Sequence, residues 1–394
     1  MFQRLVSRNE DLGRLVDKGY AVSFRNNCLV VSDVPYLNRS GELEVGAIVA
    51  KLVFVDESLV RQDDHQVLFA GGVPHGLDRK PIPNLGGGEV QFPMGPSAPD
   101  VVVQRSFSNK PIPGGAFPDF FEKIESYVGI IAGPAMERYG RSALTHRSEP
   151  ELEDQTVFRV RDAMSSRAGI TDLASLFADE VVAIIGLGGT GSYLLDFLVR
   201  TPVRAIRGFD GDTFALHNAF RSPGRIDTSE FGQSKAAVLQ SRYEQLHGDL
   251  RLSCKVIDDS AAAELDGVTF AFVCVDHGPS RGSILRLLET LGIPCIDVGL
   301  GLKRGPTGIT GMIRTTRFGK DGASLARTPG LAEVSERPEG LYDANIQIGE
   351  LNALNAALAV IQYKQARGFY GASEQAFHYL FGVDDLKVVG YNGD

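Results

Sequence analysis

The sequence predicts an α/β protein whose core is a doubly wound, Rossmann-like, mainly parallel sheet, preceded by a smaller mixed α+β N-terminal domain. Two observations point to the core. Aliphatic runs such as Val181–Ile185 are of the kind that a parallel sheet buries on both faces, and helical segments alternate with these runs towards the C-terminus. A third observation sets the boundary, because residues 140–155 are polar and charged, as in a linker. We therefore expect two domains, residues 1–150 and residues 151–394.

The first of these domains carries both helical and strand patterns. A helical stripe of apolar residues fills positions 1–20, and a hairpin is expected between Ala21 and Val31, with polar residues at its turn. Loops rich in glycine and proline separate the segments that come next. Those segments are expected strands at 47–55, 66–69 and 101–107 and an expected helix at 118–135. In the second domain, trailing helices are expected at 348–367 and 373–381.

Composition places the chain among ordinary globular proteins. Apolar residues make up 43% and charged residues 23% of its 394 residues, which argues against wholesale disorder. A balance of 40 basic and 49 acidic residues gives a net charge of −9, which disfavours a protein that coats nucleic acid. The N-terminus has no secretory pattern, and no apolar run approaches the ~20 residues that span a bilayer. We expect a soluble, cytoplasmic protein with no membrane or nucleic-acid partner.

The cysteines indicate neither a disulfide framework nor a zinc site. They stand at Cys28, Cys254, Cys274 and Cys295, too few and too scattered for a disulfide scaffold in a chain of this length. No C-x-x-C pair is present in the sequence, so a four-sulfur zinc site is excluded and no structural zinc is expected. The last three cysteines lie in apolar, strand-like runs, where we expect cysteine to be buried as a small hydrophobic residue.

A glycine-rich loop follows the clearest strand and precedes a helix. Its glycines are Gly186, Gly188, Gly189 and Gly191; they let the backbone turn sharply and approach a ligand, and the helix after them offers N–H groups to phosphate oxygens. By itself this loop fits a dinucleotide, a mononucleotide or a tight turn without any ligand. Asp210 ends the next strand, where a carboxylate can accept hydrogen bonds from ribose hydroxyls. Up to this point an NAD(P)-dependent oxidoreductase fits equally well.

The stretch that follows distinguishes between these interpretations. Residues His217–Gly224 read H-N-A-F-R-S-P-G, residues Phe231–Lys235 read F-G-Q-S-K, and Asp276 ends the strand-like run F-V-C-V. Together with the glycine loop and Asp210, these residues resemble the ThiF/HesA/MoeB superfamily of adenylating enzymes, which activate ubiquitin-like proteins and sulfur carriers. The elements stand in the order of that family and near its spacing. The resemblance covers about residues 155–370, and the combined motifs are far more specific than the glycine loop.

The resemblance implies an ATP-dependent adenylyltransferase that uses Mg²⁺. Arg221 and Lys235 match the family's pair of phosphate-contacting cations, and Asp276 matches the carboxylate that helps to hold Mg²⁺. Taken singly, these residue types also occur as solvated surface cations, helix caps or turn residues, and only their joint occurrence behind the glycine loop favours function. By the same resemblance, nucleotide placement falls to Asn218 for the phosphates or bound water, Asp210 for the ribose and, less directly, Asp212.

The resemblance also predicts partners. Family members act on a ubiquitin-like or sulfur-carrier protein with a C-terminal glycine, usually as homodimers in which an arginine of one protomer reaches the ATP of the other. The sequence does not choose among Arg159, Arg161 and Arg167 for that role. The glycine-dotted stretch 301–340 is expected to be the loop that crosses over the carrier tail. Residues 1–150 lie outside the resemblance, and this layout suggests a bacterial conjugation or defence system in which they recognise a partner or the carrier.

One departure from the family limits the predicted reaction. No cysteine follows Cys295, whereas relatives that form a thioester or persulfide place one beyond the corresponding strand. Adenylation is therefore supported and thioester transfer on this chain is not, so the adenylate would pass to a thiol-bearing conjugating partner.

Two other functions stay open. An NAD(P)-dependent oxidoreductase leaves Arg221, Lys235 and Asp276 unexplained, and a non-catalytic scaffold that binds a ubiquitin-like protein has no need of these charges.

Overall fold

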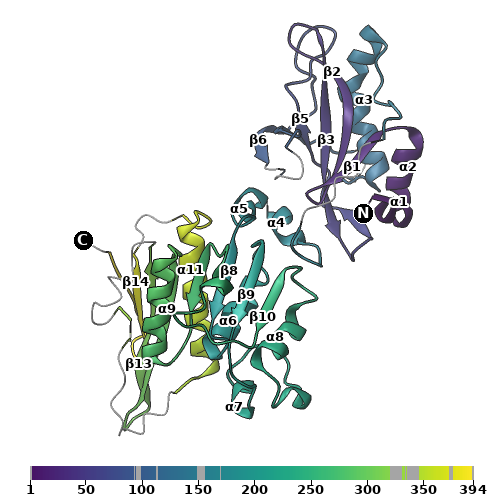
Figure 1. The fold of residues 1–394 in the computed structure, drawn as a ribbon. Helices are drawn as coiled ribbons and strands as arrows, with labels where there is room; N and C mark the ends of the chain where they lie inside the picture. Colours follow the sequence, from purple (N-terminus) through teal and green to yellow (C-terminus); the bar gives the residue numbers. More distant parts are fainter. Residues whose placement is uncertain are drawn as a thin grey trace. The chain divides into compact units, whose positions relative to one another are not determined.

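Two separate sheets divide the chain into two units (Figure 1). Unit 1 comprises Met1–Gln155 and Arg161–Ser175, and unit 2 comprises Thr156–Val160 and Leu176–Asp394. Each unit has its own buried apolar clusters, as expected of a part that buries its own core. The computed structural model describes residues 2–92, 94, 99–111, 114–148, 156–168, 170–319, 331–332, 334, 346–371 and 376–392.

Unit 1 is built on an antiparallel sheet of seven strands in the order β1-β2-β3-β5-β7-β6, with β4 paired to β3. The predicted hairpin is confirmed as β1 and β2, and its turn residues Asn26 and Asn27 have φ angles of 50° and 53°, as a two-residue hairpin turn of this kind requires. The elements of unit 1 are α1 (Phe2–Arg8), α2 (Glu10–Lys18), β1 (Ala21–Arg25), β2 (Cys28–Leu37), β3 (Leu43–Phe54), β4 (Val60–Gln62), β5 (Val67–Ala70), β6 (Gly88–Phe92), β7 (Val103–Phe107), α3 (Phe120–Tyr139), α4 (Ala163–Ala168) and α5 (Thr171–Ser175).

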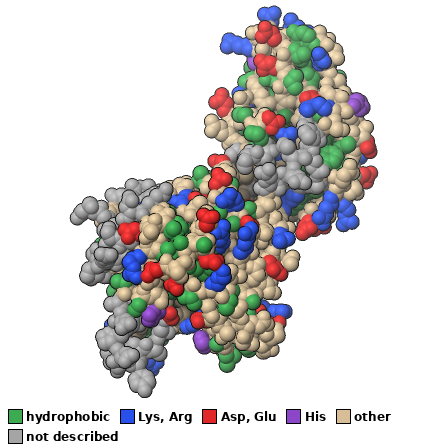
Figure 2. Space-filling view, viewed as in Figure 1, with side chains coloured by type: hydrophobic (Ala, Val, Ile, Leu, Met, Phe, Trp, Pro, Cys, Tyr) green, Lys and Arg blue, Asp and Glu red, His purple; other side chains and the backbone are tan. Residues whose placement is uncertain are grey.

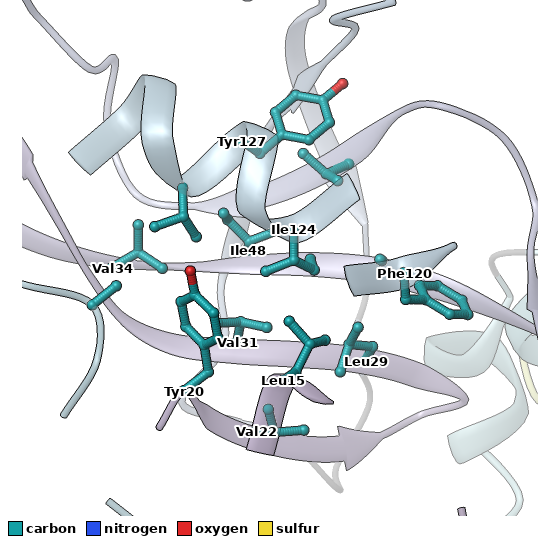
Figure 3. Packing of buried hydrophobic residues seen from close by; sticks show 14 of the residues in the cluster. Leu15, Tyr20, Val22, Leu29, Val31, Val34, Ile48, Phe120, Ile124 and Tyr127 are labelled. Carbon is teal, nitrogen blue, oxygen red and sulfur yellow. The ribbon is translucent and has the colours of Figure 1, made fainter. Parts of the chain in front are cut away.

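The main core of unit 1 lies between its helices and one face of this sheet. Figure 3 shows Phe120 and Ile124 of α3 gathered over Leu29 and Val31 of β2, with Leu15 of α2 beside them. Residues four apart on α3 point to the same side of the helix, so its apolar face is presented to the sheet. The side chains in this cluster are almost completely removed from water, and their burial supplies the main favourable term for folding of the unit.

One cation is buried beside this core. Lys123 on α3 is 1% exposed, and its Nζ donates a hydrogen bond to the backbone carbonyl of Asp64 at 2.7 Å. Burial disfavours the charged amine and lowers the pKa of Lys123 to about 8, although the carboxylates of Asp64 and Asp63 partly offset this effect. Unit 1 therefore contains an amine that titrates close to the physiological range.

Unit 2 contains an eight-stranded sheet in the order β10-β9-β8-β11-β12-β13-β14-β15. The pairings from β10 to β12 are all parallel and those from β12 to β15 antiparallel, which confirms the predicted doubly wound, mainly parallel core. The elements are β8 (Val181–Ile185), α6 (Gly189–Leu198), β9 (Ala205–Phe209), α7 (Leu216–Ala219), α8 (Lys235–Tyr243), β10 (Leu250–Ser253), β11 (Phe270–Val273), α9 (Gly278–Thr290), β12 (Cys295–Arg304), β13 (Ile309–Phe318), α11 (Gly349–Ala366), β14 (His378–Gly382) and β15 (Val388–Tyr391).

Helices cover both faces of this sheet, so its central strands are buried on both sides. Val182 and Ile184 of β8 belong to the cluster that includes residues of α6, α8 and α11. Their neighbours Val181, Ala183 and Ile185 belong to a second cluster, on the face that α9 covers (Figure 1). Successive residues of a strand point to opposite faces, and the continuous aliphatic run of β8 follows from this two-sided burial. Strand order reverses between β8 and β11, the position where doubly wound sheets bind ligands.

Three expectations about local structure were wrong. Residues 373–381 were expected to be helical, but the aromatic and aliphatic side chains at 378–382 form strand β14 on the antiparallel edge. Strand β10 ends at Ser253, so Cys254 lies beyond the sheet and is exposed. The stretch 301–340 begins with a hairpin, because β12 continues to Arg304 and pairs with β13. Most of the remainder of that stretch lies outside the described residues.

Charged side chains of both signs are interspersed over the face of each unit that Figure 2 shows. This mixture accords with a net charge that is small for a chain of this length. Within the described ranges, no helix combines the length and the apolar character that crossing a bilayer would need.

Substitution of Lys123 should remove a pH dependence of folding. The folded protein binds the Lys123 proton less tightly than the unfolded chain does, because burial lowers the pKa to about 8 from 10.5. The free-energy cost of burying the charged amine is therefore complete below about pH 8. It decreases as the pH rises towards the pKa of Lys123 in the unfolded chain. We expect the free energy of urea unfolding to rise between about pH 8 and about pH 10, and Lys123→Met to show a smaller rise. An equal rise in the unchanged protein and in Lys123→Met would contradict the lowered pKa of Lys123.

Candidate functional site

A cleft of about 440 Å³ opens in unit 2 beside the carboxyl ends of β8, β9 and β11. Ile185 of β8 pairs with Phe209 of β9 on one side and with Val273 of β11 on the other. Because these strands are parallel and in register, the residues that follow them converge at one edge although they lie far apart in the sequence. Of the predicted site residues, Gly191 alone does not line the cleft; those that do are Gly186, Gly188, Gly189, Asp210, Asp212, Asn218, Arg221, Lys235 and Asp276.

Two glycines give the loop its shape. Gly186 has a φ of +97°, and a Cβ on it would lie 2.9 Å from the carbonyl group of Cys274. A Cβ on Gly191, in the first turn of α6, would lie 1.9 Å from the carbonyl oxygen of Gly186. Gly188 differs, because a Cβ there would meet no atom within 4 Å. Gly186 and Gly191 are therefore required by the fold of the loop, whereas Gly188 borders open space in the cleft.

The N-terminus of α6 faces the cleft through Gly188, Gly189 and Thr190. Thr190 Oγ1 donates to Asn352 Oδ1 of α11 at 3.0 Å, and the Asn352 amide packs so closely that a Cβ on Gly189 would lie 2.3 Å from its Nδ2. A glycine is therefore needed at position 189 because α11 packs closely against α6 there. The free N–H groups at the start of a helix, together with its dipole, favour an anion at this place.

A cluster of opposite charges lies at the end of β9. Asp210 accepts hydrogen bonds from the N–H of Leu187 at 2.7 Å and from the N–H of Asp212 at 2.9 Å. The Nζ of Lys235 lies 2.6 Å from the carboxylate of Asp212 and 3.5 Å from that of Asp210. Lys235 and Asp210 are both 8% exposed, whereas Asp212 is 77% exposed. Asp210 therefore holds the glycine loop in place, and the two carboxylates hold Lys235 at the cleft.

Arg221 and Asn218 are positioned by the short helix α7. Asn218 Oδ1 accepts a hydrogen bond from the N–H of Ala215 at 2.8 Å, so this residue caps the helix as well as lining the cleft. The Nε of Arg221 is buried and has no hydrogen-bond partner among the described residues. Burial lowers the pKa of Arg221, and the carboxylate of Asp276 partly offsets this effect. A buried guanidinium donor without a partner favours an anionic ligand in the cleft.

Asp276 stands in the loop between β11 and α9, and a chain of ionic contacts fixes this loop. Arg281 of α9 donates to the backbone carbonyl of Val275 and, through its Nε, to the carboxylate of Asp297 on β12 at 2.9 Å. Arg314 of β13 donates to the other oxygen of Asp297. Asp297 is 0% exposed, and the two arginines supply the charge that a buried carboxylate needs.

Sequence reasoning missed Asp297 and its two arginines. The signal was available, because Asp297 interrupts the aliphatic strand C-I-D-V, and a carboxylate in a fully buried strand requires a charged partner. Gln347, which also lines the cleft, and Asn355, which lines a neighbouring cavity, were not identified from the sequence. Of the arginines proposed to act across a dimer, Arg161 donates to Asn27 in unit 1, and the side chain of Arg167 lies outside the description.

Cys274 lies in the wall of the cleft. Burial raises the pKa of its thiol well above the ordinary value, with Asp297 adding to the effect, so this sulfur is protonated and weakly nucleophilic at neutral pH. Cys254 was expected to be buried but is exposed, and its Sγ lies 3.8 Å from the carbonyl of Gly211. Within the part of the chain that the structure describes, no three His, Cys, Asp or Glu side chains gather as a ready-made metal site.

The doubly wound sheet, with a glycine loop and charged side chains at its strand ends, places unit 2 in the Rossmann-like α/β class. The sequence model of the ThiF family matches residues 161–366, which is more than half of the chain, and the chain therefore belongs to the ThiF family. A second model, described as a domain of unknown function (DUF6791), matches residues 10–163.

Similarity to individual proteins is more distant. The tRNA threonylcarbamoyladenosine dehydratase of Escherichia coli K12 is 27% identical over 130 residues, or 32% of this chain, and the match spans about half (47%) of that relative's length. The E. coli enzyme TcdA in complex with AMP is 18% identical with a TM-score of 0.41, over 53% of this chain and 96% of TcdA. Structures of E. coli MccB (13% identity, TM-score 0.45, 59% of this chain and 72% of MccB) and of PaaA (16%, 0.42, 56% and 75%) are also similar.

Gly191→Ala should destabilise unit 2, whereas Gly188→Ala should leave it folded. The first substitution places a Cβ 1.9 Å from the Gly186 carbonyl oxygen, and the second meets no atom within 4 Å. We expect Gly191→Ala to lower the free energy of unfolding by about 1–3 kcal/mol, which is the usual cost of forcing an extra carbon into a packed site. Thermal or urea unfolding of both variants measures this loss. Equal stability of the two variants would show that the loop does not have this geometry.

Removal of the Asp297 carboxylate should be far more costly than removal of an exposed one. Asp297→Ala leaves the nearly buried guanidinium groups of Arg281 and Arg314 without their counter-charge, and breaking such a group costs about 3–5 kcal/mol. The matched control is Asp249→Ala, which removes the exposed pair with Arg251 and should cost about 0–1 kcal/mol. Similar losses in urea unfolding for both variants would contradict the role of Asp297.

Proposed function

We propose that this protein uses ATP to adenylate the C-terminal carboxylate of a ubiquitin-like or sulfur-carrier protein, with release of pyrophosphate. The observation that carries the proposal is the meeting of the glycine loop, Asp210, Arg221, Lys235 and Asp276 in one cleft at the switch point of the sheet. A nicotinamide-dependent reaction would use the glycine loop and Asp210, but it would not explain the two cations and the Asp276 carboxylate. Membership of the ThiF family supports the same conclusion.

In the proposed reaction, an oxygen of the substrate carboxylate attacks the α-phosphorus of ATP. A bond from that oxygen to phosphorus forms, the bond from phosphorus to the bridging oxygen of the β-phosphate breaks, and pyrophosphate leaves with the electron pair. Both reactants are anions, so cations must screen their approach and stabilise the charge that develops on the leaving group. The unpartnered Nε of Arg221 and the amine of Lys235 are two groups of the cleft suited to this task.

Lys235 is already in position before a nucleotide arrives. Its contacts with Asp212 and Asp210 place the amine at the cleft, and Asp212 is exposed enough to yield the amine to a phosphate oxygen. The carboxylate of Asp210 is accepting backbone hydrogen bonds, but each carboxylate oxygen can accept more than one, which leaves capacity for ribose hydroxyls. The site would thus bind nucleotide with little rearrangement.

Asp276 would hold Mg²⁺ together with phosphate oxygens. The donor set fits this ion, because Mg²⁺ at phosphate-transfer sites is commonly bound by one or two carboxylates, water and the substrate itself. When bound, the ion supplies further charge neutralisation at the phosphates. The part of this chain is to hold the backbone next to Asp276: Arg281 donates to the Val275 carbonyl and is itself bound to Asp297.

The product would leave as an acyl adenylate for another protein. No cysteine follows Cys295, and burial raises the pKa of the Cys274 thiol in the wall of the cleft, so we propose that the thiol that receives the acyl group belongs to a conjugating partner. We also propose a homodimer in the cytoplasm, and recognition of the carrier or of another partner by unit 1. Light scattering of the purified chain tests the dimer directly.

Arg221→Ala should reduce ATP–pyrophosphate exchange by on the order of 10²-fold, the scale of losing one charge-stabilising group. The assay uses purified protein, ATP, Mg²⁺, labelled pyrophosphate and a peptide with a free C-terminal glycine. Lys235→Ala should lose a similar factor, whereas the control Arg225→Ala, whose side chain is 88% exposed, should exchange like the unchanged protein. Tight binding of NADH with no binding of ATP would instead favour an oxidoreductase.

A further inference from the structure

The segment that carries Arg221 follows α7 and runs over the surface of unit 2. It comprises residues 220–230, and two of its apolar side chains are largely exposed, Phe220 at 76% and Ile226 at 50%. A surface segment that buries little apolar area has low local stability, so the polar contacts of its backbone and side chains decide how firmly it is held. The place of the Arg221 guanidinium therefore depends on those contacts.

One side chain of α8 holds this segment at two points. Arg242 donates from Nη1 to the backbone carbonyl of Pro223 at 2.8 Å, only two residues after Arg221. Its Nε donates to one carboxylate oxygen of Glu230 at 2.9 Å, and its Nη2 donates to the other oxygen. All three guanidinium nitrogens are thus engaged, in a forked geometry that lysine cannot reproduce.

These contacts are largely shielded from water. The side chains of Arg242 and Glu230 are 14% and 17% exposed, so their attraction is screened less than that of a surface pair. The Cζ of Arg242 also lies over the Phe214 ring, 5.2 Å from its centre. Phe214 packs with Ala219 of α7 and Val238 of α8. Arg242 therefore adds directional contacts to apolar packing that already joins the two helices.

The same helix carries the second cation of the cleft. Lys235 is the first residue of α8, and it lines the cleft. Arg242 follows seven residues later, close to two full turns, so both side chains leave the helix on the same face. Helix α8 thus presents Lys235 directly and, two turns further on, holds the segment that presents Arg221.

We propose that Arg242 is a positioning residue for the nucleotide, which keeps the Arg221 guanidinium where it meets a phosphate of ATP by holding Pro223 and Glu230. The inference rests on the proposed function for the identity of the ligand and adds a residue outside the cleft to it. Arg242 is not among the residues that line the cleft. Its effect on ATP binding therefore runs through Arg221 and should disappear when Arg221 is removed.

A double-mutant cycle on the full chain tests this dependence. Arg242→Lys keeps the charge but removes the forked geometry. We expect it to raise the Kd for ATP about tenfold, the lower end of the effect of changing an outer partner of a binding residue. In Arg221→Ala, the same substitution should change the Kd by less than about twofold, the usual error of additivity. Titration calorimetry with ATP and Mg²⁺ measures all four Kd values. A tenfold loss in both backgrounds would overturn the proposal, because Arg242 would then not act through Arg221.

Arg367→Lys is the matched control. Arg367 makes the same forked contact, with Glu180, and its side chain is 23% exposed. Glu180 directly precedes β8, whereas the cleft lies at the other end of that strand. We expect Arg367→Lys and Arg242→Lys to lower the midpoint of urea unfolding similarly, but only Arg242→Lys to raise the Kd for ATP. An equal rise in the two variants would show a general loss of stability and contradict the proposal.

A second variant removes the same contact without altering α8. Glu230→Gln should raise the Kd for ATP as Arg242→Lys does, and an unchanged Kd in both variants would overturn the inference while leaving adenylation intact. ATP binding that follows the expected cycle, with no pyrophosphate exchange for any peptide, would overturn adenylation and support the role of Arg242. ATP binding that Arg221→Ala leaves unchanged would overturn the role given to Arg221 and the inference about Arg242 with it.

Discussion

The close contact between the start of α6 and the carbonyl of Gly186 is the constraint on which the candidate site depends. Because only a hydrogen atom fits between the Cα of Gly191 and that carbonyl, α6 can begin directly after β8 with its N–H groups at the cleft. The turn also brings the N–H of Leu187 to the carboxylate of Asp210. The glycine loop and the end of β9 are thereby held together. The charged residues that follow the other strands lie opposite this fixed loop.

The parallel sheet explains why the site could be predicted from the sequence. Residues directly after buried parallel strands must meet at one edge, so Asp210 and Asp276 converge with the glycine loop whatever the intervening chain does. What could not be predicted depends on long-range contacts. The place of Asn355 is set by how α11 packs, and Cys254 is exposed because β10 ends at Ser253, before the apolar residues Val256 and Ile257 where the strand was expected to end. The β14 strand exists because β13 offers it an edge, which no local pattern records.

Electrostatics links the fold to the proposed chemistry. Three carboxylates and three arginine or lysine side chains at the site are bound to one another before any substrate is present, through Lys235 with Asp210 and Asp212 and through Arg281 and Arg314 with Asp297. Preorganised charges of this kind need little rearrangement when charge develops in a reaction. Arg221 differs, because its buried Nε still lacks a partner among the described residues. Arg221 is therefore the group most clearly prepared for an anionic ligand, and the carboxylate of Asp276 partly offsets the lowering of its pKa by burial.

In the proposed reaction, a carboxylate oxygen of the substrate becomes bonded to the α-phosphorus of ATP. Isotope transfer can follow that oxygen. A peptide with ¹⁸O in its C-terminal carboxylate is incubated with the protein, ATP and Mg²⁺, and the activated product is cleaved by hydroxylamine. We expect the AMP released to contain one ¹⁸O atom, as measured by mass spectrometry, and Arg221→Ala to form far less of this labelled AMP. AMP without ¹⁸O, or turnover of ATP to ADP and phosphate, would contradict adenylation.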